Sequence, residues 1–284
     1  MLTFESASTS SPAVAYFLTA CIGISLYNPT ETIILIFATF KRYGGYYFWS
    51  LLIACLGLIV AVIGYSTYFF NITSNKFVQT TVTVTGWSIF VVAQSLVLWS
   101  RLYLVIQSQR ILHGVLAMII INAFVLLIPT VVMAFGNDTV DPSPEFLRGY
   151  TIMEKIQLSL FSTQEFVISG LYLWGTINLL KLTSEKRKRN LILQLFTINV
   201  ILVLMDCVLL GVEFAGYRIL QINLKWLVYS FKLKLEIAVL SRLVSFVKGP
   251  HEYRNQSLGL SSSVPNSTHQ DRTKSEWRPF SQGI

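Results

Sequence analysis

Seven apolar runs, each long enough to cross a lipid bilayer, recur along almost the whole chain. A helix crosses the hydrocarbon core, about 30 Å thick, with about 20 residues at a rise of 1.5 Å per residue. Because an unpaired peptide group in hydrocarbon costs several kcal/mol, only helices or closed barrels span membranes, and the sequence has no run of short alternating strands. It therefore predicts seven transmembrane helices, at Pro12–Phe40, Tyr46–Phe70, Thr80–Val105, Ile111–Phe135, Thr151–Leu180, Leu191–Gly216 and Ile219–Val247.

The composition indicates the same fold class. Charged residues make up 13% of the 284 residues, whereas soluble domains average about 25%. We therefore expect an all-α, polytopic membrane protein whose seven-transmembrane-helix bundle occupies residues 12–247. Residues 1–11 would form a short extracellular or lumenal segment, and the polar residues 248–284 a disordered cytoplasmic tail. The expected location is the plasma membrane or an endomembrane.

Lysine and arginine residues gather at one end of the predicted helices. Because cytoplasmic loops carry an excess of these residues, the N-terminus is predicted to lie outside and the C-terminus in the cytoplasm. The same bias accounts for the net charge of +8, so nucleic acid is not an expected partner. The densest basic cluster is predicted to be a cytoplasmic loop that attracts anionic lipid or contacts a cytoplasmic signalling protein, and it consists of Lys186, Arg187, Lys188 and Arg189.

Two glycosylation sequons fall on the predicted outer side, at Asn71-Ile-Thr and Asn137-Asp-Thr. Both asparagines are candidate glycosylation sites. Asn71 is predicted to lie close to the membrane surface, whereas Asn137 lies in a longer loop and is the better acceptor.

Six ionisable residues interrupt four of the apolar runs. The helical rise from the nearest basic residue or helix start at the cytoplasmic end places all of them about 15 to 24 Å deep, in one slab near the middle of the bilayer. Even the milder insertion scales charge about 2.5 to 3.5 kcal/mol for such a residue facing lipid. All six are therefore predicted to face the bundle interior as a ligand-binding site or charge network: Glu31, Glu165, Asp206, Lys232, Lys234 and Glu236.

The spacing of the charges in the last run suggests how they pair. Lys232 and Glu236 are four residues apart, on one helix face and within reach of one another, and Lys225 extends this face. Lys234 points to the opposite side, so it needs an acid on a neighbouring helix. With four acids to two lysines, at least one carboxyl group is expected to hold a proton or lie beside water. A network of ion pairs that only sets helix register remains an equal alternative to a functional site.

Sequence motifs that are typical of metal, cofactor and catalytic sites are missing. The sequence contains no phosphate-binding glycine loop, no HExxH motif and no histidines at metal-ligand spacing, so neither a cofactor nor a metal is predicted and no catalytic residue is assigned. A retinal protein is disfavoured because the third run lacks a carboxylate. Arg101, at the end of that run, is predicted to extend toward the membrane interface.

Five segments of the chain resemble, in order, a fungal family of multi-span membrane proteins described as domain of unknown function 7703. The resemblance covers Tyr27 to Val247 and includes polar residues embedded in apolar runs. It implies a seven-helix fungal membrane protein, loosely similar to rhodopsin-like receptor candidates, and implies no ligand or catalytic residue. The segments are "FATFKRYGGYYFWSLLIA", "QSLVLWSRLYLV", "MIIINAF", "EKIQLSLFSTQEFVISGLYLW" and "VYSFKLKLE".

These observations leave three functional hypotheses. The first is a receptor-like sensor with a polar site near Lys232 and Glu236, a small apolar ligand and a cytoplasmic signalling partner. The second is an intramembrane enzyme of the terpenoid-cyclase kind, with Glu31, Glu165 and Asp206 as candidate acids. The third is a proton-coupled carrier. All three place the protein in a lipid bilayer.

Overall fold

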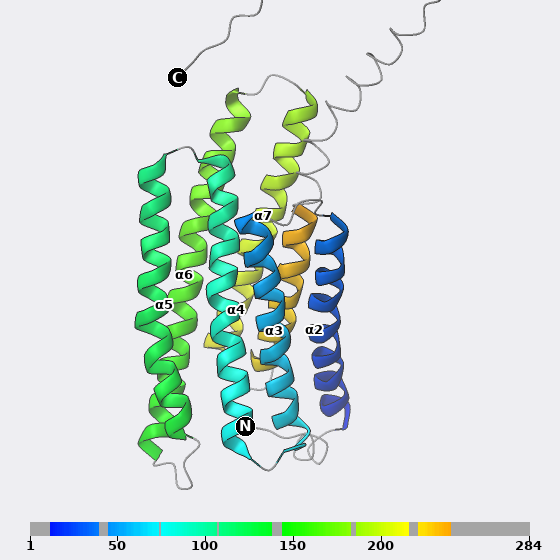
Figure 1. Cartoon of the computed structure of the whole chain (residues 1–284), viewed down its shortest axis with the longest axis vertical. Helices are drawn as coiled ribbons and strands as arrows, with labels where there is room; N and C mark the ends of the chain where they lie inside the picture. Colours follow the sequence, from blue (N-terminus) through cyan, green and yellow to red (C-terminus); the bar gives the residue numbers. More distant parts are fainter. Residues whose placement is uncertain are drawn as a thin grey trace, which may run out of the picture. The chain divides into compact units, whose positions relative to one another are not determined.

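The structure is a computed structural model that describes residues 12–39, 45–73, 75–106, 108–137, 144–182, 186–215 and 221–239. Every regular element in these ranges is a helix, which confirms the predicted all-α class (Figure 1). All described residues belong to one compact unit, Met1–Val244. The elements are α2 (Pro12–Thr39), α3 (Tyr46–Phe69), α4 (Lys76–Val105), α5 (Gln109–Asn137), α6 (Pro144–Leu182), α7 (Lys186–Phe214) and the helix over residues 221–239.

Five of these helices are long and apolar enough to cross a membrane, which indicates a multi-pass membrane protein. They are α2, α3, α4, α5 and α7. The other two described helices are α6 and the 221–239 helix, and these carry Glu165 and the residues Lys232, Lys234 and Glu236. Most of the charged residues in the predicted slab thus belong to the two helices that are not among the five apolar ones.

Several helices extend beyond the apolar runs that predicted them. α6 begins at Pro144 and α7 at Lys186, ahead of the predicted starts at Thr151 and Leu191. The predicted basic loop is therefore wrong in one respect, because Lys186 to Arg189 form the first turn of α7. The physical reason is that hydropathy marks only the lipid-facing part of a helix, and no proline or glycine breaks the chain between Lys186 and Leu191.

Some predictions fall on residues of which little is described. The segments 1–11 and 248–284 lie outside the described residues, as do the side chains of Asn137, Lys186, Arg187 and Lys188. Arg189 is exposed. Asn71 lies in the turn between α3 and α4, with a φ of 53°, two residues after Phe69 at the end of α3.

Glycine residues let α3 and α4 pack with their backbones close together. A Cβ atom on Gly57 would lie 2.8 Å from the Phe90 nitrogen, and one on Gly86 would lie 2.8 Å from Ala61 Cα. Small residues at such positions are a usual device of membrane helices, because their association depends on close van der Waals packing. The α3–α4 hairpin is therefore a closely packed pair that also contacts α2, α5 and α6, whereas α7 packs on α6.

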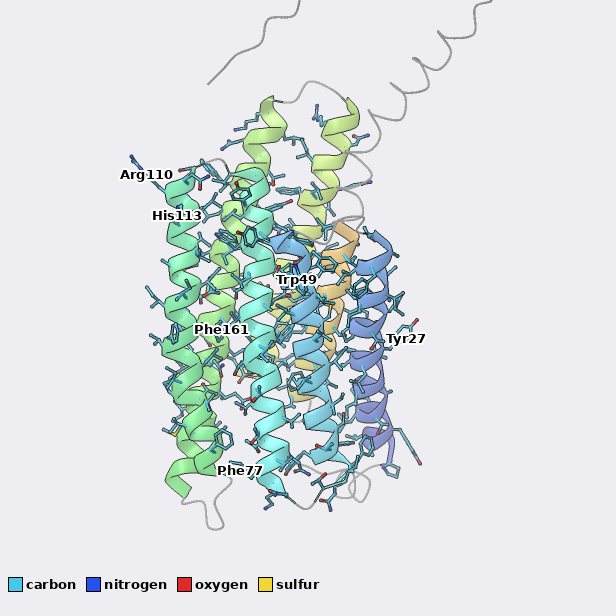
Figure 2. The ribbon with its side chains drawn as sticks, viewed as in Figure 1. Tyr27, Trp49, Phe77, Arg110, His113 and Phe161 are labelled. Atoms are coloured by element: carbon cyan, nitrogen blue, oxygen red, sulfur yellow. The ribbon has the colours of Figure 1, made fainter. Side chains whose placement is uncertain are left out.

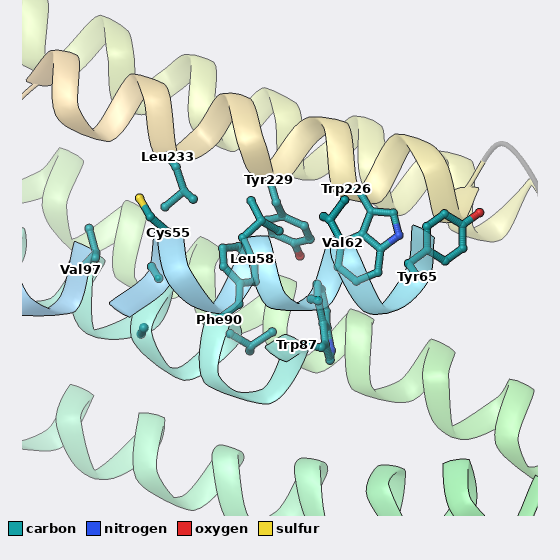
Figure 3. Close-up of a cluster of buried hydrophobic side chains, with 14 of the residues drawn as sticks. Cys55, Leu58, Val62, Tyr65, Trp87, Phe90, Val97, Trp226, Tyr229 and Leu233 are labelled. Atoms are coloured by element: carbon teal, nitrogen blue, oxygen red, sulfur yellow. The ribbon is translucent and has the colours of Figure 1, made fainter. Parts of the chain in front are cut away.

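The 221–239 helix packs on this hairpin through aromatic side chains (Figure 3). The Trp87 ring of α4 lies edge-on to Trp226, with centroids 5.4 Å apart, and 5.5 Å from the Tyr229 ring. Phe90 lies 5.1 Å from Tyr229. Because Trp226, Tyr229 and Leu233 occupy this contact, the adjacent Lys232 and Glu236 are carried into the bundle interior.

Candidate functional site

A lysine of the 221–239 helix lies between carboxyl groups from two other helices. Lys232 Nζ donates a hydrogen bond of 2.8 Å to Glu165 Oε2 of α6 and another to Asp206 Oδ1 of α7. All three side chains are buried, and Lys232 is 2% exposed. We call these three residues the lysine triad. It joins three helices at one point inside the protein.

The lysine triad holds more acid than base. One ammonium group faces two carboxyl groups, so the three side chains carry a formal charge of −1 when all are ionised. Burying a net charge is costly where water is excluded. One bound proton makes the triad neutral, and the ammonium group then has one ionised partner on either α6 or α7.

A second buried ion pair joins α4 to the 221–239 helix. Arg101 Nη1 lies 2.5 Å from Glu236 Oε1. The Tyr47 hydroxyl donates to the Glu236 backbone carbonyl at 3.0 Å, and the guanidinium carbon lies 5.4 Å from the centre of the Tyr172 ring. The prediction that Arg101 extends to the membrane interface is therefore wrong, since it is 3% exposed. An acid on a neighbouring helix holds it inside, which sequence spacing within one helix cannot reveal.

A third ion pair lies at the edge of the bundle. Lys234 Nζ donates to Glu31 Oε2 of α2 at 2.6 Å. The acid on a neighbouring helix that was predicted to pair with Lys234 is therefore Glu31 of α2. Both side chains are partly exposed, at 38% for Lys234 and 31% for Glu31. We call these two residues the edge pair. Neither joins the lysine triad, so the six predicted residues do not form one site.

Polar side chains also follow one face of the 221–239 helix. Lys225, Tyr229, Lys232 and Glu236 are spaced by four, three and four residues, which places them on one side of a helix. Lys225 Nζ lies 3.9 Å from the Trp87 ring centre and 3.9 Å from Glu154 Oε1. Lys232 Nζ lies 5.0 Å from the Tyr229 ring centre. Titratable groups therefore succeed one another along about 16 Å of this helix.

Uncharged polar groups surround the charged ones. Asn122 of α5 donates to Gln164 Oε1 at 2.8 Å, and Gln164 Nε2 donates to Ser95 Oγ at 2.9 Å, which links α5, α6 and α4. Gln94 Oε1 and Ser162 Oγ are buried and have no hydrogen-bond partner within the described part of the chain. Buried polar atoms of this kind usually bind water or a ligand.

The family model described as "Domain of unknown function (DUF7703)" matches residues 6–251. The chain belongs to this family. The match covers all seven described helices and confirms the resemblance seen in the sequence. No curated protein matches the chain.

The family match assigns no role to any residue, so the site rests on geometry alone. Sequence reasoning missed the pairing of Arg101 with Glu236, the contribution of Tyr47 and the contact of Glu154 with Lys225. No signal in the sequence indicated the Arg101 pairing, because Glu236 is on another helix. Glu154 gave no signal either, since it lies in the less apolar first half of α6.

The lysine triad can hold its three helices together through direct contacts between charged groups. The charges contact one another directly, and both triad carboxyl groups are occupied by Lys232. Among the described residues, no group of three or more histidine, cysteine or acidic side chains could hold a metal ion. The lysine triad is thus a connection among three helices that has one ammonium group and two competing partners.

Proposed function

We propose that this protein is a receptor-like membrane sensor in which the lysine triad is the switch. In this proposal all seven helices span the bilayer, with the N-terminus outside and the C-terminus in the cytoplasm. A small apolar ligand changes the conformation of the bundle. A cytoplasmic protein that contacts the basic turn Lys186 to Arg189 binds according to that conformation. The supporting observation is that Lys232 contacts carboxyl groups from both α6 and α7.

Two pairings of one lysine provide two states. When Glu165 is the ionised partner, Lys232 holds α6 and the link to α7 weakens; when Asp206 is ionised, α7 is held instead. Two arrangements that differ by a few kcal/mol are what a conformational switch requires. A ligand that binds one arrangement more tightly then shifts the population toward it.

Neutralising each acid separately tests the proposal. Asp206→Asn leaves Lys232 with Glu165 alone, and Glu165→Gln leaves it with Asp206 alone. Spin labels on Tyr103 of α4 and Gln194 of α7, both exposed, report the position of α7 by pulsed electron resonance in lipid nanodiscs. The labels require a background in which Cys21, Cys55 and Cys207 are replaced by alanine.

The expected result is a shift of at least about 2 Å in the mean label distance of Asp206→Asn relative to Glu165→Gln. Glu31→Gln removes the same charge from the edge pair and is the matched control, which should leave the distance unchanged. Superimposable distributions for both triad variants would contradict the switch.

A proton-coupled carrier is the second candidate, supported by the succession of titratable groups at Lys225, Tyr229, Lys232 and Glu236. Proteoliposomes that enclose a pH-sensitive dye should then acidify under an imposed potential, and Lys232→Met should abolish the signal. Equal acidification with and without the protein would rule this candidate out. The terpenoid-cyclase alternative has no such support, because its three candidate acids are all paired with lysines: Glu165 and Asp206 with Lys232, and Glu31 with Lys234.

A further inference from the structure

The edge pair lies on a surface of the bundle whose exposed side chains are mostly apolar. The partly exposed Glu31 is in line with the exposed Ile24, Tyr27 and Ile34 of α2. These residues follow one another at intervals of three or four, so they share one face of the helix. Figure 2 shows Tyr27 at the outer edge of α2. The Lys234 ammonium group lies 5.8 Å from the centre of this ring, so the lysine reaches around α2 to its exposed side.

The residues before and after Glu31 on α2 indicate how deep the edge pair lies in the membrane. Ile24 and Tyr27 precede Glu31 on this face, and Ile34 and Leu35 follow it. Glu31 lies eight residues before the end of α2 at Thr39, or about 12 Å along the helix. Because α2 is apolar enough to cross a membrane, this pair lies at the level of the acyl chains rather than of the headgroups.

Acyl chains cannot cover such a pair favourably. The two charges cancel, but each group retains hydrogen-bonding capacity that hydrocarbon does not satisfy. Ionisable residues of membrane helices almost always face protein or water for this reason. A polar partner on this face would satisfy the hydrogen-bonding capacity that remains, whereas lipid phosphate groups lie nearer the membrane surface.

We propose that this face of α2 and the 221–239 helix is a dimer interface between two copies of the chain. The face is self-complementary, because it carries one acid and one base side by side. A two-fold axis through it brings Glu31 of each copy next to Lys234 of the other, which is the contact pattern of an isologous dimer. The four charges then form a ring shielded from lipid. This surface does not involve the lysine triad, so it is independent of the proposed switch.

Charge exchange between copies tests this interface directly. Glu31→Lys and Lys234→Glu each place two like charges on one copy, and each variant alone should lose self-association at least tenfold. When the two variants are expressed together, every contact between copies is again between opposite charges. Two affinity tags and two fluorophores then measure co-purification and single-molecule co-localisation in nanodiscs formed from native membranes.

The expected result is that the mixture recovers the association of the wild type. The doubly exchanged chain, Glu31→Lys/Lys234→Glu, restores opposite charges within each copy and between copies, and shows that the fold tolerates the exchange. If this chain dimerises but the mixture does not, the edge pair acts only within one copy and the proposal is overturned. A monomeric wild type, with or without a lipid retained on this face, also overturns it.

Cysteine cross-linking gives a second measurement that does not disturb the charges. In a background with Cys207 replaced by alanine, Ile34→Cys on α2 should cross-link between copies in the membrane. Phe124→Cys on α5 is the matched control, because both side chains are exposed in the single chain, each at 65%. Cross-linking at Phe124 but not at Ile34 would place the contact on another face and overturn the proposal.

Discussion

Replacing Lys232 by methionine tests the energetic reasoning most directly. The substitution keeps an unbranched side chain, one atom shorter, but removes the one cation among the described residues that pairs with Glu165 and Asp206. Removing one partner of a buried ion pair typically costs about 3–5 kcal/mol, because the remaining charge stays buried without compensation. Two carboxyl groups are left here, so we expect a loss at the upper end of this range. That is a large part of a total stability of about 5–15 kcal/mol.

Reversible unfolding in mixed detergent micelles measures this loss. Trp87 and Trp226 are buried at the contact between α4 and the 221–239 helix, so the part of the fluorescence that these two of the six tryptophans contribute follows the separation of these helices. Lys234→Met is the matched control on the same helix. Its loss should be smaller, because the Glu31 carboxylate left behind is partly exposed, whereas Glu165 and Asp206 are buried.

A triple variant decides whether the loss comes from uncompensated charge. Replacing a complete buried ion cluster by neutral residues is often close to neutral for stability. Lys232→Met/Glu165→Gln/Asp206→Asn should therefore recover at least about 2 kcal/mol of the loss caused by Lys232→Met alone. A single substitution that costs less than about 1 kcal/mol, or a triple variant as unstable as the single one, would refute the reasoning.

Three further substitutions probe the packing around the triad with the same unfolding assay. Gly86→Val places a side chain against the backbone of α3 and should cost at least about 1–3 kcal/mol, whereas Gly114→Val, with nothing within 4 Å of the added Cβ, should change stability by less than about 0.5 kcal/mol. Gln164→Leu removes two hydrogen bonds between helices and should cost about 1 kcal/mol, at the average of about 0.6 kcal/mol for such bonds in membranes. Glu236→Gln leaves the Arg101 guanidinium unpaired and should cost about 3–5 kcal/mol, and adding Arg101→Gln should restore most of it; a double variant less stable than either single one would contradict this pairing.

The charged residues show how far sequence reasoning reaches. Periodicity placed Lys232 and Glu236 on one face of a helix and Lys234 on the other, and the structure has them so. The same periodicity put Lys232 within reach of Glu236, yet each is paired with another helix. Spacing along one helix gives directions, whereas the choice of partner depends on the height and rotation of neighbouring helices. Arg101 was misjudged for the same reason.

The order of the residues alone predicts apolar helices, because a helix in hydrocarbon satisfies its own backbone hydrogen bonds whatever its neighbours are. It also shows which ionisable residues lie inside the apolar runs. Which acid meets which base depends on how the helices pack in three dimensions, since the partners of Lys232 are 67 and 26 residues away and that of Lys234 is 203 residues away. The aromatic contacts between the 221–239 helix and the closely packed α3–α4 hairpin fix the rotation of that helix. This rotation directs Lys232 into the interior and Lys234 to the edge.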